Sequence, residues 1–320
     1  MHSAGRILVV GNFVADLIAR PLDRLPEPGK LLILDTLETH AGGNAPNTGG
    51  ALGRLGAAVS VCGRVGQDAH GAFLLGRLEE WGVDIGPVVR DPQATTGATL
   101  VSVDHVGERS FSHCFGANAA FTADDVHWDA VDDLTHVHVC GFFVLPALDG
   151  QSVAALLAAA RGRGLSTSLD VCWDREGRWL ENLGPALPFV DIFLPSENEA
   201  GAMTGETEPA AMAAHLRDRG CGAVVVKRGA LGVEYYGPEG GLACPAFAVE
   251  AQDTTGAGDC CIAGYLYGRL RNWELERTLR FACACGARSV QAIGGVTGMA
   301  PAPEIEQWMA DTPVRGRQAR

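Results

Sequence analysis

The sequence contains no run of about 18–20 uncharged apolar residues, which a membrane-spanning helix requires, so a transmembrane span is excluded. Basic residues are scarce: 25 Lys and Arg stand against 38 Asp and Glu, and the formal net charge is −13. Nucleic-acid binding depends on clustered Lys and Arg, so this balance argues against a nucleic-acid partner. A small phosphorylated ligand is still compatible with the charge, because a few backbone amides can hold a phosphate group locally.

The 10 cysteines do not indicate a zinc site, because no CxxC pair or Cys/His cluster has zinc-finger spacing. They are also spread thinly through a long chain, unlike the cysteines of small secreted disulfide scaffolds. The N-terminus lacks the long apolar segment and the small-residue cleavage site of a signal peptide. The sequence therefore predicts a cytoplasmic protein whose thiols are reduced.

Apolar residues make up 47% of the chain, and strand-like and helix-like segments alternate along most of it. A short apolar run closed by glycine predicts a buried strand at Arg6–Gly11. Further strands are expected at Ala58–Cys62, His136–Cys140, Leu165–Leu169, Asp191–Leu194 and Ala223–Val226, with extra strands at Leu231–Tyr236 and Ala246–Glu250. Helices are expected at Thr48–Leu55, Ala69–Trp81, Gln151–Arg163, Glu197–Thr204 and Pro209–Arg219, and over most of the chain after Gly256. This alternation predicts a mostly parallel sheet that is covered by helices on both faces.

Two stretches depart from this alternation. Leu31–Thr39 and Thr96–Phe115 are typical of strands, yet no helix separates the strands within them. The second stretch has a glycine-containing turn around Gly107, which indicates a hairpin. The two stretches are expected to form a small separate sheet; the alternative is a decorated edge of the main sheet.

The strongest chemical signal is Asp253–Gly264, with the sequence DTTGAGDCCIAG. Here Gly256, Ala257 and Gly258 precede Asp259 at the expected start of a helix. Free backbone N–H groups and the helix dipole stabilise negative charge at such a point, and glycine lets the backbone approach the anion closely. Asp259 is either a helix cap or the group that accepts a proton from an attacking hydroxyl.

A second glycine-rich stretch, Gly42–Gly50, also leads into a helix and is followed by Gly56 and Gly66. It has neither the GxGxxG pattern of dinucleotide-binding proteins nor the GxxxxGK[ST] pattern of a P-loop. The segment after the first strand, Gly11-Asn-Phe-Val-Ala, does not supply GxGxxG either, so a dehydrogenase is disfavoured.

The two motifs together resemble those of the ribokinase-like (PfkB) family of carbohydrate kinases. Gly42-Gly43, Asn47, Gly56 and Gly66 are in register with the first signature of that family, and Asp253–Leu266 matches the second throughout. The resemblance implies one kinase domain over residues 1–320, a three-layer α/β/α sandwich with a mostly parallel central sheet. It also implies a small β-sheet lid, formed by about 12–42 and 94–118 of this sequence.

The resemblance also implies roles for individual residues. Asp259 is similar to the catalytic base of the family, with Gly256, Ala257 and Gly258 as the anion hole. The residues implied to bind the substrate are Asn12, Asp16, Gly43 and Asn47, and those implied to bind the nucleotide are Ser196, Glu199, Lys227 and Gly229. Glu199 is implied to orient Mg²⁺ through water, and Asp253 and Thr255 to form a monovalent-cation site for K⁺. Ser196 stands where the family usually has Asn, and Asn44 where ribokinases usually have Lys.

The activity that the resemblance implies is transfer of the γ-phosphate of ATP to a hydroxymethyl group of a small carbohydrate. A homodimer formed through the lid is also expected. Two alternatives stay open: a nucleoside kinase of the same family, and a sugar-binding regulator that has the kinase scaffold without catalysis. Which sugar, sugar acid, sugar phosphate or nucleoside is the acceptor does not follow from the sequence.

Overall fold

The computed structural model describes residues 5–316. In it the strand β1 (Arg6–Val10), with the sequence RILVV, lies inside an 8-stranded sheet, and its four apolar residues after Arg6 are buried. The strands follow one another in the order β14 (Gly240–Cys244), β13 (Val233–Gly237), β12 (Ala223–Lys227), β11 (Ile192–Phe193), β10 (Ser166–Leu169), β9 (Leu134–Val139), β1 and β4 (Val59–Cys62). Neighbours from β12 to β4 are parallel, whereas β13 and β14 are antiparallel additions at one edge. The mostly parallel central sheet predicted from the sequence is confirmed.

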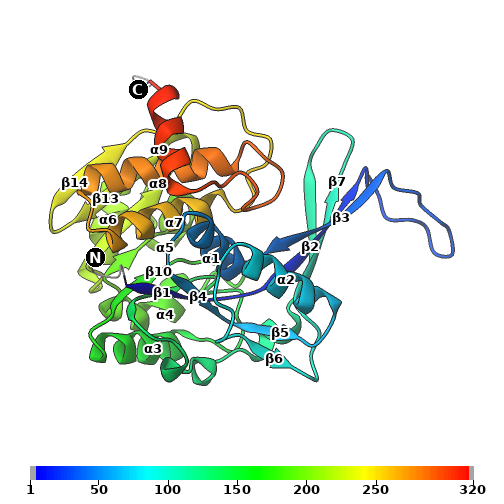
Figure 1. The fold of residues 1–320 in the computed structure, drawn as a ribbon, viewed down its shortest axis with the longest axis horizontal. Coiled ribbons are helices and arrows are strands. Elements are labelled where there is room, and N and C mark those ends of the chain that lie inside the picture. The colour runs from blue at the N-terminus through cyan, green and yellow to red at the C-terminus, as the bar shows by residue number, and fades with distance from the viewer. Residues whose placement is uncertain (1–4, 317–320) are drawn as a thin grey trace.

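Helices cover both faces of this sheet and give the molecule three layers (Figure 1). On one face Ile7 and Val9 belong to a core with residues of α1 (Asn44–Arg54), α2 (Ala69–Glu80), α7 (Ala257–Leu270), α8 (Leu275–Ser289) and α9 (Ala302–Asp311). On the other face Leu8 and Val10 belong to a core with residues of α3 (Gly150–Gly162), α4 (Trp179–Leu183), α5 (Glu197–Thr204) and α6 (Pro209–Asp218). Because successive strand residues point to opposite faces, an unbroken apolar strand contributes to both cores.

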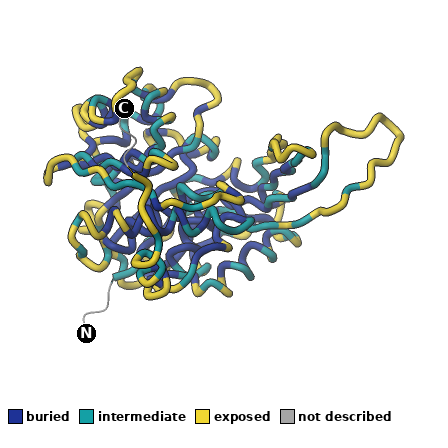
Figure 2. The backbone as a smooth tube through the Cα atoms, turned by 90° about the horizontal axis from the view of Figure 1, so that it is seen from above, coloured by how far each residue is buried: buried dark blue, intermediate teal, exposed yellow. Residues whose placement is uncertain are grey.

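A second, 4-stranded sheet projects from the main body (Figure 1) and contains β3 (Thr36–Gly42), β2 (Val14–Arg20), β7 (Ala98–Val103) and β8 (Arg109–Cys114) in that order. Strands β3, β7 and β8 overlap the two stretches that depart from the alternation, and the second stretch forms the expected hairpin. Strand β2 lies outside both stretches, within the segment 12–42 that the resemblance assigned to the lid. The strand predicted at Leu31–Thr39 is wrong in its first half, because β3 begins only at Thr36. Its pairing with β2 ends at Arg20, and the next residue, Pro21, has no N–H to continue the ladder. The loop between β2 and β3 is largely exposed (Figure 2).

The strand predicted at Ala246–Glu250 is also wrong. The strand that follows β13 is β14, and after it only an isolated bridge joins Phe247 to Val314. The sequence of β14, GGLAC, forms a half-exposed edge strand and therefore lacks the apolar pattern by which buried strands are recognised.

Short elements fill the remaining connections: β5 (Arg64–Gly66), β6 (Val89–Asp91) and the 3₁₀ turns Gly116–Ala120, Ala123–Asp125, Trp128–Ala130, Gly184–Phe189 and Gly229–Leu231. Within residues 5–316, no helix is both long and apolar enough to cross a membrane. The parallel strands end along one edge of the main sheet, and in open parallel sheets ligands bind at this edge.

Candidate active site

A cavity of about 900 Å³ lies where the parallel strands end and α7 begins. Its lining includes the residues predicted for catalysis and for nucleotide binding: Gly256, Ala257, Gly258, Asp259, Ser196, Glu199, Lys227 and Gly229. The two glycine-rich motifs meet at this point, since Asn47 and Asp259 are hydrogen-bonded across 212 residues of sequence. The fold therefore brings together the motifs on which the family resemblance was based.

Asp259 is a buried carboxylate whose two oxygens each accept a hydrogen bond from a side-chain amide of α1. Asn44 Nδ2 donates to Oδ1 at 3.0 Å, and Asn47 Nδ2 donates to Oδ2 at 2.9 Å. Burial raises the pKa of Asp259 to about 6, although the bond from Asn47 and the charge of Lys227 oppose the shift. Such a pKa suits a general base, which must be ionised near neutral pH and still bind a proton during the reaction.

The N-terminus of α7 is open toward the cavity. Its N-cap is Gly256, whose φ is 70°, and a Cβ added there would lie 2.8 Å from the Cα of Gly295. Within residues 5–316, the N–H groups of Gly258 and Asp259 donate to no acceptor. These free groups and the helix dipole favour an anion at this point. Because Gly256 is the N-cap and the Asp259 side chain bonds to α1, Asp259 is not a helix cap.

Lys227, the last residue of β12, forms an ion pair with Asp170, which follows β10. The Nζ–Oδ1 distance is 2.8 Å, and both side chains are largely buried. Burial by itself lowers the pKa of Lys227, but the charges of Asp170 and Glu199 oppose this and the net shift is upward. A Cβ added at Gly258 would lie 3.5 Å from Nζ, so the ammonium group stands beside the N-terminus of α7. Asp170 was not predicted from the sequence as a site residue, although an acid directly after a predicted strand is a recognisable signal.

Ser196 and Glu199 form a capping box at the start of α5. The N–H of Ser196 donates to Oε2 of Glu199 at 2.7 Å, and the N–H of Glu199 donates to Oγ of Ser196 at 3.3 Å. One carboxylate oxygen of Glu199 is therefore committed to the helix start. In the described part of the chain, no group of three or more His, Cys, Asp or Glu residues is arranged to hold a metal ion.

Two of the residues predicted to bind substrate lie at the junction of β1 and α1. The side-chain oxygen of Asn12 accepts the N–H of Asn44 at 3.2 Å, which fixes the first turn of α1. Gly43, with φ 89°, passes so close that a Cβ added there would lie 2.5 Å from the carbonyl oxygen of Asn12. A side chain at position 43 is therefore excluded both by contact and by conformation.

The other two residues predicted to bind substrate are not bonded to each other. Asp16 lies on β2 and is bonded to Thr99 on the neighbouring β7, and burial raises the pKa of Asp16 to about 6. Asn47 donates to Asp259, and its own buried oxygen has no hydrogen-bond partner within residues 5–316. An unpartnered buried carbonyl is costly, and a ligand hydroxyl that donates to it would remove that cost.

Asp253 and Thr255 are hydrogen-bonded to an arginine that was not predicted from the sequence as a site residue. Arg109, on β8 of the small sheet, donates from Nη1 to Oδ1 of Asp253 at 2.8 Å and to Oγ1 of Thr255 at 2.7 Å. The other oxygen of Asp253 accepts the N–H of Gly294 at 2.9 Å. The position that the resemblance assigned to a monovalent cation therefore already has a guanidinium group as its neighbour.

Comparison with known families assigns the chain to the carbohydrate kinases. Residues 4–303 match the family described as pfkB family carbohydrate kinase, and the chain belongs to that family. The recognition made from the two motifs is confirmed, and with it the class of enzyme, an ATP-dependent carbohydrate kinase.

Individual relatives support the same assignment. An ATP-dependent ribose-1-phosphate kinase of Halopiger xanaduensis is 31% identical over 88% of this chain and 90% of that protein. An aminoimidazole riboside kinase of Salmonella typhimurium is 29% identical over 95% of this chain and 94% of that protein. The structure of Arabidopsis thaliana ribokinase complexed with ribose and ATP is 25% identical, with a TM-score of 0.85 over 95% of this chain and 98% of that one.

Proposed function

We propose that the protein transfers the γ-phosphate of ATP to a hydroxymethyl group of a small carbohydrate, with Asp259 as the base. The observation that carries this proposal is the position of Asp259, a buried carboxylate with a raised pKa at the open N-terminus of α7. A carboxylate that only stabilised the fold would not need free N–H groups of the backbone beside it.

In the proposed reaction the acceptor hydroxyl gives its proton to Asp259 while its oxygen forms a bond to the γ-phosphorus. The bond from that phosphorus to the bridging oxygen breaks, and ADP leaves. The N–H groups of Gly258 and Asp259 and the ammonium group of Lys227 stabilise the charge of the transferred group. When substrate binds, its hydroxyls form hydrogen bonds to Asn47 and Asp259 that replace the hydrogen bond between these two side chains. One substrate hydroxyl also donates to the side-chain oxygen of Asn47.

Mg²⁺ fits this site as an ion held mainly by phosphate oxygens and water, which is its usual mode of binding. Glu199 has one oxygen free for a water-mediated contact, and Asp170 lies nearby but is paired with Lys227. When bound, the ion neutralises charge on the phosphates. Ser196 acts through the capping box that orients Glu199, and Gly229 lines the nucleotide side of the cavity.

The experiment that tests the proposal is the release of ADP over a panel of ketoses, aldoses, ketodeoxy acids, sugar phosphates and nucleosides. Turnover on a free or phosphorylated sugar supports it, and the named activity of the 31% identical relative makes ribose 1-phosphate the first compound to test. Preferred turnover on nucleosides would favour the second candidate, which the named activity of the riboside kinase supports. Sugar binding without ADP release would identify a regulator instead of an enzyme.

The monovalent-cation site at Asp253 and Thr255 yields a prediction for Arg109. We expect the activity of Arg109→Gln to depend more steeply on K⁺ than that of the wild type, because the ion must replace the guanidinium charge beside Asp253. The measurement is kcat/KM against KCl at constant ionic strength. The control is Arg24→Gln, which removes a charge from the exposed loop between β2 and β3. Parallel K⁺ dependence of Arg109→Gln and wild type would contradict the prediction.

We also propose that two copies associate through the small sheet. Its strand register places Leu17, Leu37 and Leu100 on the face opposite to the one that carries Asp16. Leu37 is 64% exposed on this face, and apolar surface of this kind favours association. We expect sedimentation to give the mass of a dimer for the wild type and of a monomer for Leu37→Ser combined with Leu100→Ser. A monomeric wild type would remove the dimer from the proposal without affecting the kinase.

A further inference from the structure

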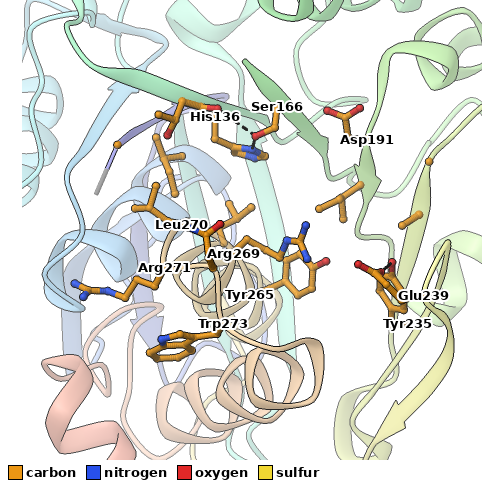
Figure 3. A pocket seen from close by; sticks show the side chains of 18 of the residues that line it. His136, Ser166, Asp191, Tyr235, Glu239, Tyr265, Arg269, Leu270, Arg271 and Trp273 are labelled. Atoms are coloured by element: carbon orange, nitrogen blue, oxygen red, sulfur yellow. Dashed lines mark hydrogen bonds between the residues drawn. The ribbon is translucent and has the colours of Figure 1, made fainter. Parts of the chain in front are cut away.

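A second cavity, of about 980 Å³, lies at the opposite edge of the main sheet, where the parallel strands begin and α7 ends. Figure 3 shows side chains from the strand starts and from the end of α7 around it. None of the residues assigned above to catalysis, substrate or nucleotide lines it. Its volume is similar to that of the candidate active site and is within the range of small-molecule sites.

Two hydrogen-bond donors at this cavity, one buried and one exposed, make no hydrogen bond to residues 5–316. Tyr265 is only 1% exposed, yet its hydroxyl makes no hydrogen bond within residues 5–316. Arg269, one turn later on α7, is exposed and makes no side-chain hydrogen bond or ion pair with the described residues, and Figure 3 shows its guanidinium beside the ring of Tyr265. A buried hydroxyl without a partner is costly, so its retention needs a reason such as a bound ligand.

In each of the two carboxylates at the cavity, one oxygen already accepts a hydrogen bond from a neighbouring side chain or backbone. Oδ2 of Asp191 accepts the N–H and the hydroxyl of Thr167 at 2.8 and 3.1 Å. Glu239 accepts the hydroxyl of Tyr235. Among the residues that line this cavity, the buried polar side-chain group without a partner in residues 5–316 is the hydroxyl of Tyr265. A ligand that complements this donor must present an acceptor.

The neighbouring histidine does not change this conclusion. Both ring nitrogens of His136 are bonded, to the hydroxyls of Ser166 and Ser168, each at 2.7 Å. Burial lowers the pKa of His136 to about 3, so the ring is neutral and offers no positive charge. Two arginines line the cavity: the guanidinium of Arg271 lies over the ring of Tyr267, whereas that of Arg269 lies beside Tyr265 (Figure 3).

From these contacts we infer that the second cavity binds a small metabolite through an oxyanion, a phosphate or a carboxylate group, which Arg269 and the hydroxyl of Tyr265 hold together. The guanidinium pairs with two oxygens of such a group, and the hydroxyl donates to one of them. Leu270 and Trp273 border the cavity and offer apolar surface to the rest of the molecule. The negative charges of Asp191 and Glu239 repel anions, so an anion that binds must use both the Arg269 guanidinium and the Tyr265 hydroxyl.

The test is ¹⁹F NMR of protein labelled with 3-fluorotyrosine. The chain has 4 tyrosines, none of which lines the candidate active site, so phosphate bound there does not contact a labelled ring. Tyr265→Phe identifies the Tyr265 resonance by its loss. We expect that resonance to shift saturably with sodium phosphate or sodium citrate but not with sodium chloride at the same ionic strength. A shift with phosphate alone identifies a phosphate site, and a shift with citrate alone identifies a carboxylate site.

Arg269→Gln is expected to weaken the binding of the effective anion about 10- to 100-fold, as for the loss of a charged hydrogen bond. Basal kinase turnover should be unchanged, because Arg269 is at the far end of α7 from Asp259. The matched control is Arg90→Gln, an exposed arginine on β6. Absence of a saturable shift with both anions, or an equal shift in Arg269→Gln, would overturn the inference. Either result leaves the proposed kinase activity unaffected, since the measurement does not involve turnover.

Discussion

Asp259→Asn is expected to reduce kcat by about 10²–10⁴-fold while the fold and ATP binding are retained. Asparagine keeps the size of the side chain, and its oxygen can still accept from Asn44 or Asn47. What is lost is the acceptor of the hydroxyl proton. The N–H groups at the start of α7 do not depend on this side chain, so nucleotide affinity should change little. Turnover, nucleotide titration and thermal unfolding are to be measured on the same preparation.

The pH profile provides the control for this prediction. With the pKa of Asp259 near 6, kcat/KM of the wild type should fall tenfold per pH unit below about pH 6, as the carboxylate becomes protonated. The residual activity of Asp259→Asn should lack that dependence. A variant that keeps most of its kcat and the same pH profile would show that the base is another group.

Asp16→Ala is expected to lower kcat/KM about 30- to 1000-fold, which corresponds to a loss of about 2–4 kcal/mol in transition-state binding. Asp16 and Asn47 are proposed to hold neighbouring hydroxyls of the acceptor, and removal of the carboxylate leaves one hydroxyl without its partner. Steady-state kinetics on the substrate that the panel identifies measures this loss.

The control for Asp16→Ala is Asp23→Ala, which removes an exposed carboxylate that is paired with His105 at the edge of the small sheet. We expect its kcat/KM to match the wild type. Near wild-type activity of Asp16→Ala itself would remove Asp16 from the substrate site. Equal losses in both variants would indicate that the small sheet has been disturbed as a whole.

The central sheet, its helix layers and the meeting of the two glycine-rich motifs were predictable from the sequence. Strands such as β1 and β12 are nearly continuous apolar runs, and the DTTGAGD motif carries its glycines directly before its acid. Local patterns of this kind can be recognised in the sequence because the residues that form them are the same residues that form the core and the candidate site.

Other features were not predictable, because they depend on contacts between distant segments. Arg109 is 144 residues from Asp253, and no local pattern marks it as a partner of that carboxylate. Asn44 appeared only as a departure from the usual lysine, whereas in the structure it bonds to the proposed base. The strand predicted around Leu31 failed because apolar residues there resemble a buried strand but have no partner strand to pair with.

The raised pKa values of Asp16 and Asp259 have a consequence for stability. In the unfolded chain each of these carboxyls titrates near 3.8, and in the folded chain near 6, so the folded state holds the proton more tightly. Their contribution to the free energy of unfolding is therefore most favourable below about pH 4 and is lost as the pH rises through 6. For the fully buried Asp259 the loss is on the order of 3 kcal/mol. A screen for thermostable variants at neutral pH would therefore enrich neutral residues at position 259. Such variants would avoid the free-energy cost of burying a charged carboxylate, but they would lose the proposed catalytic base.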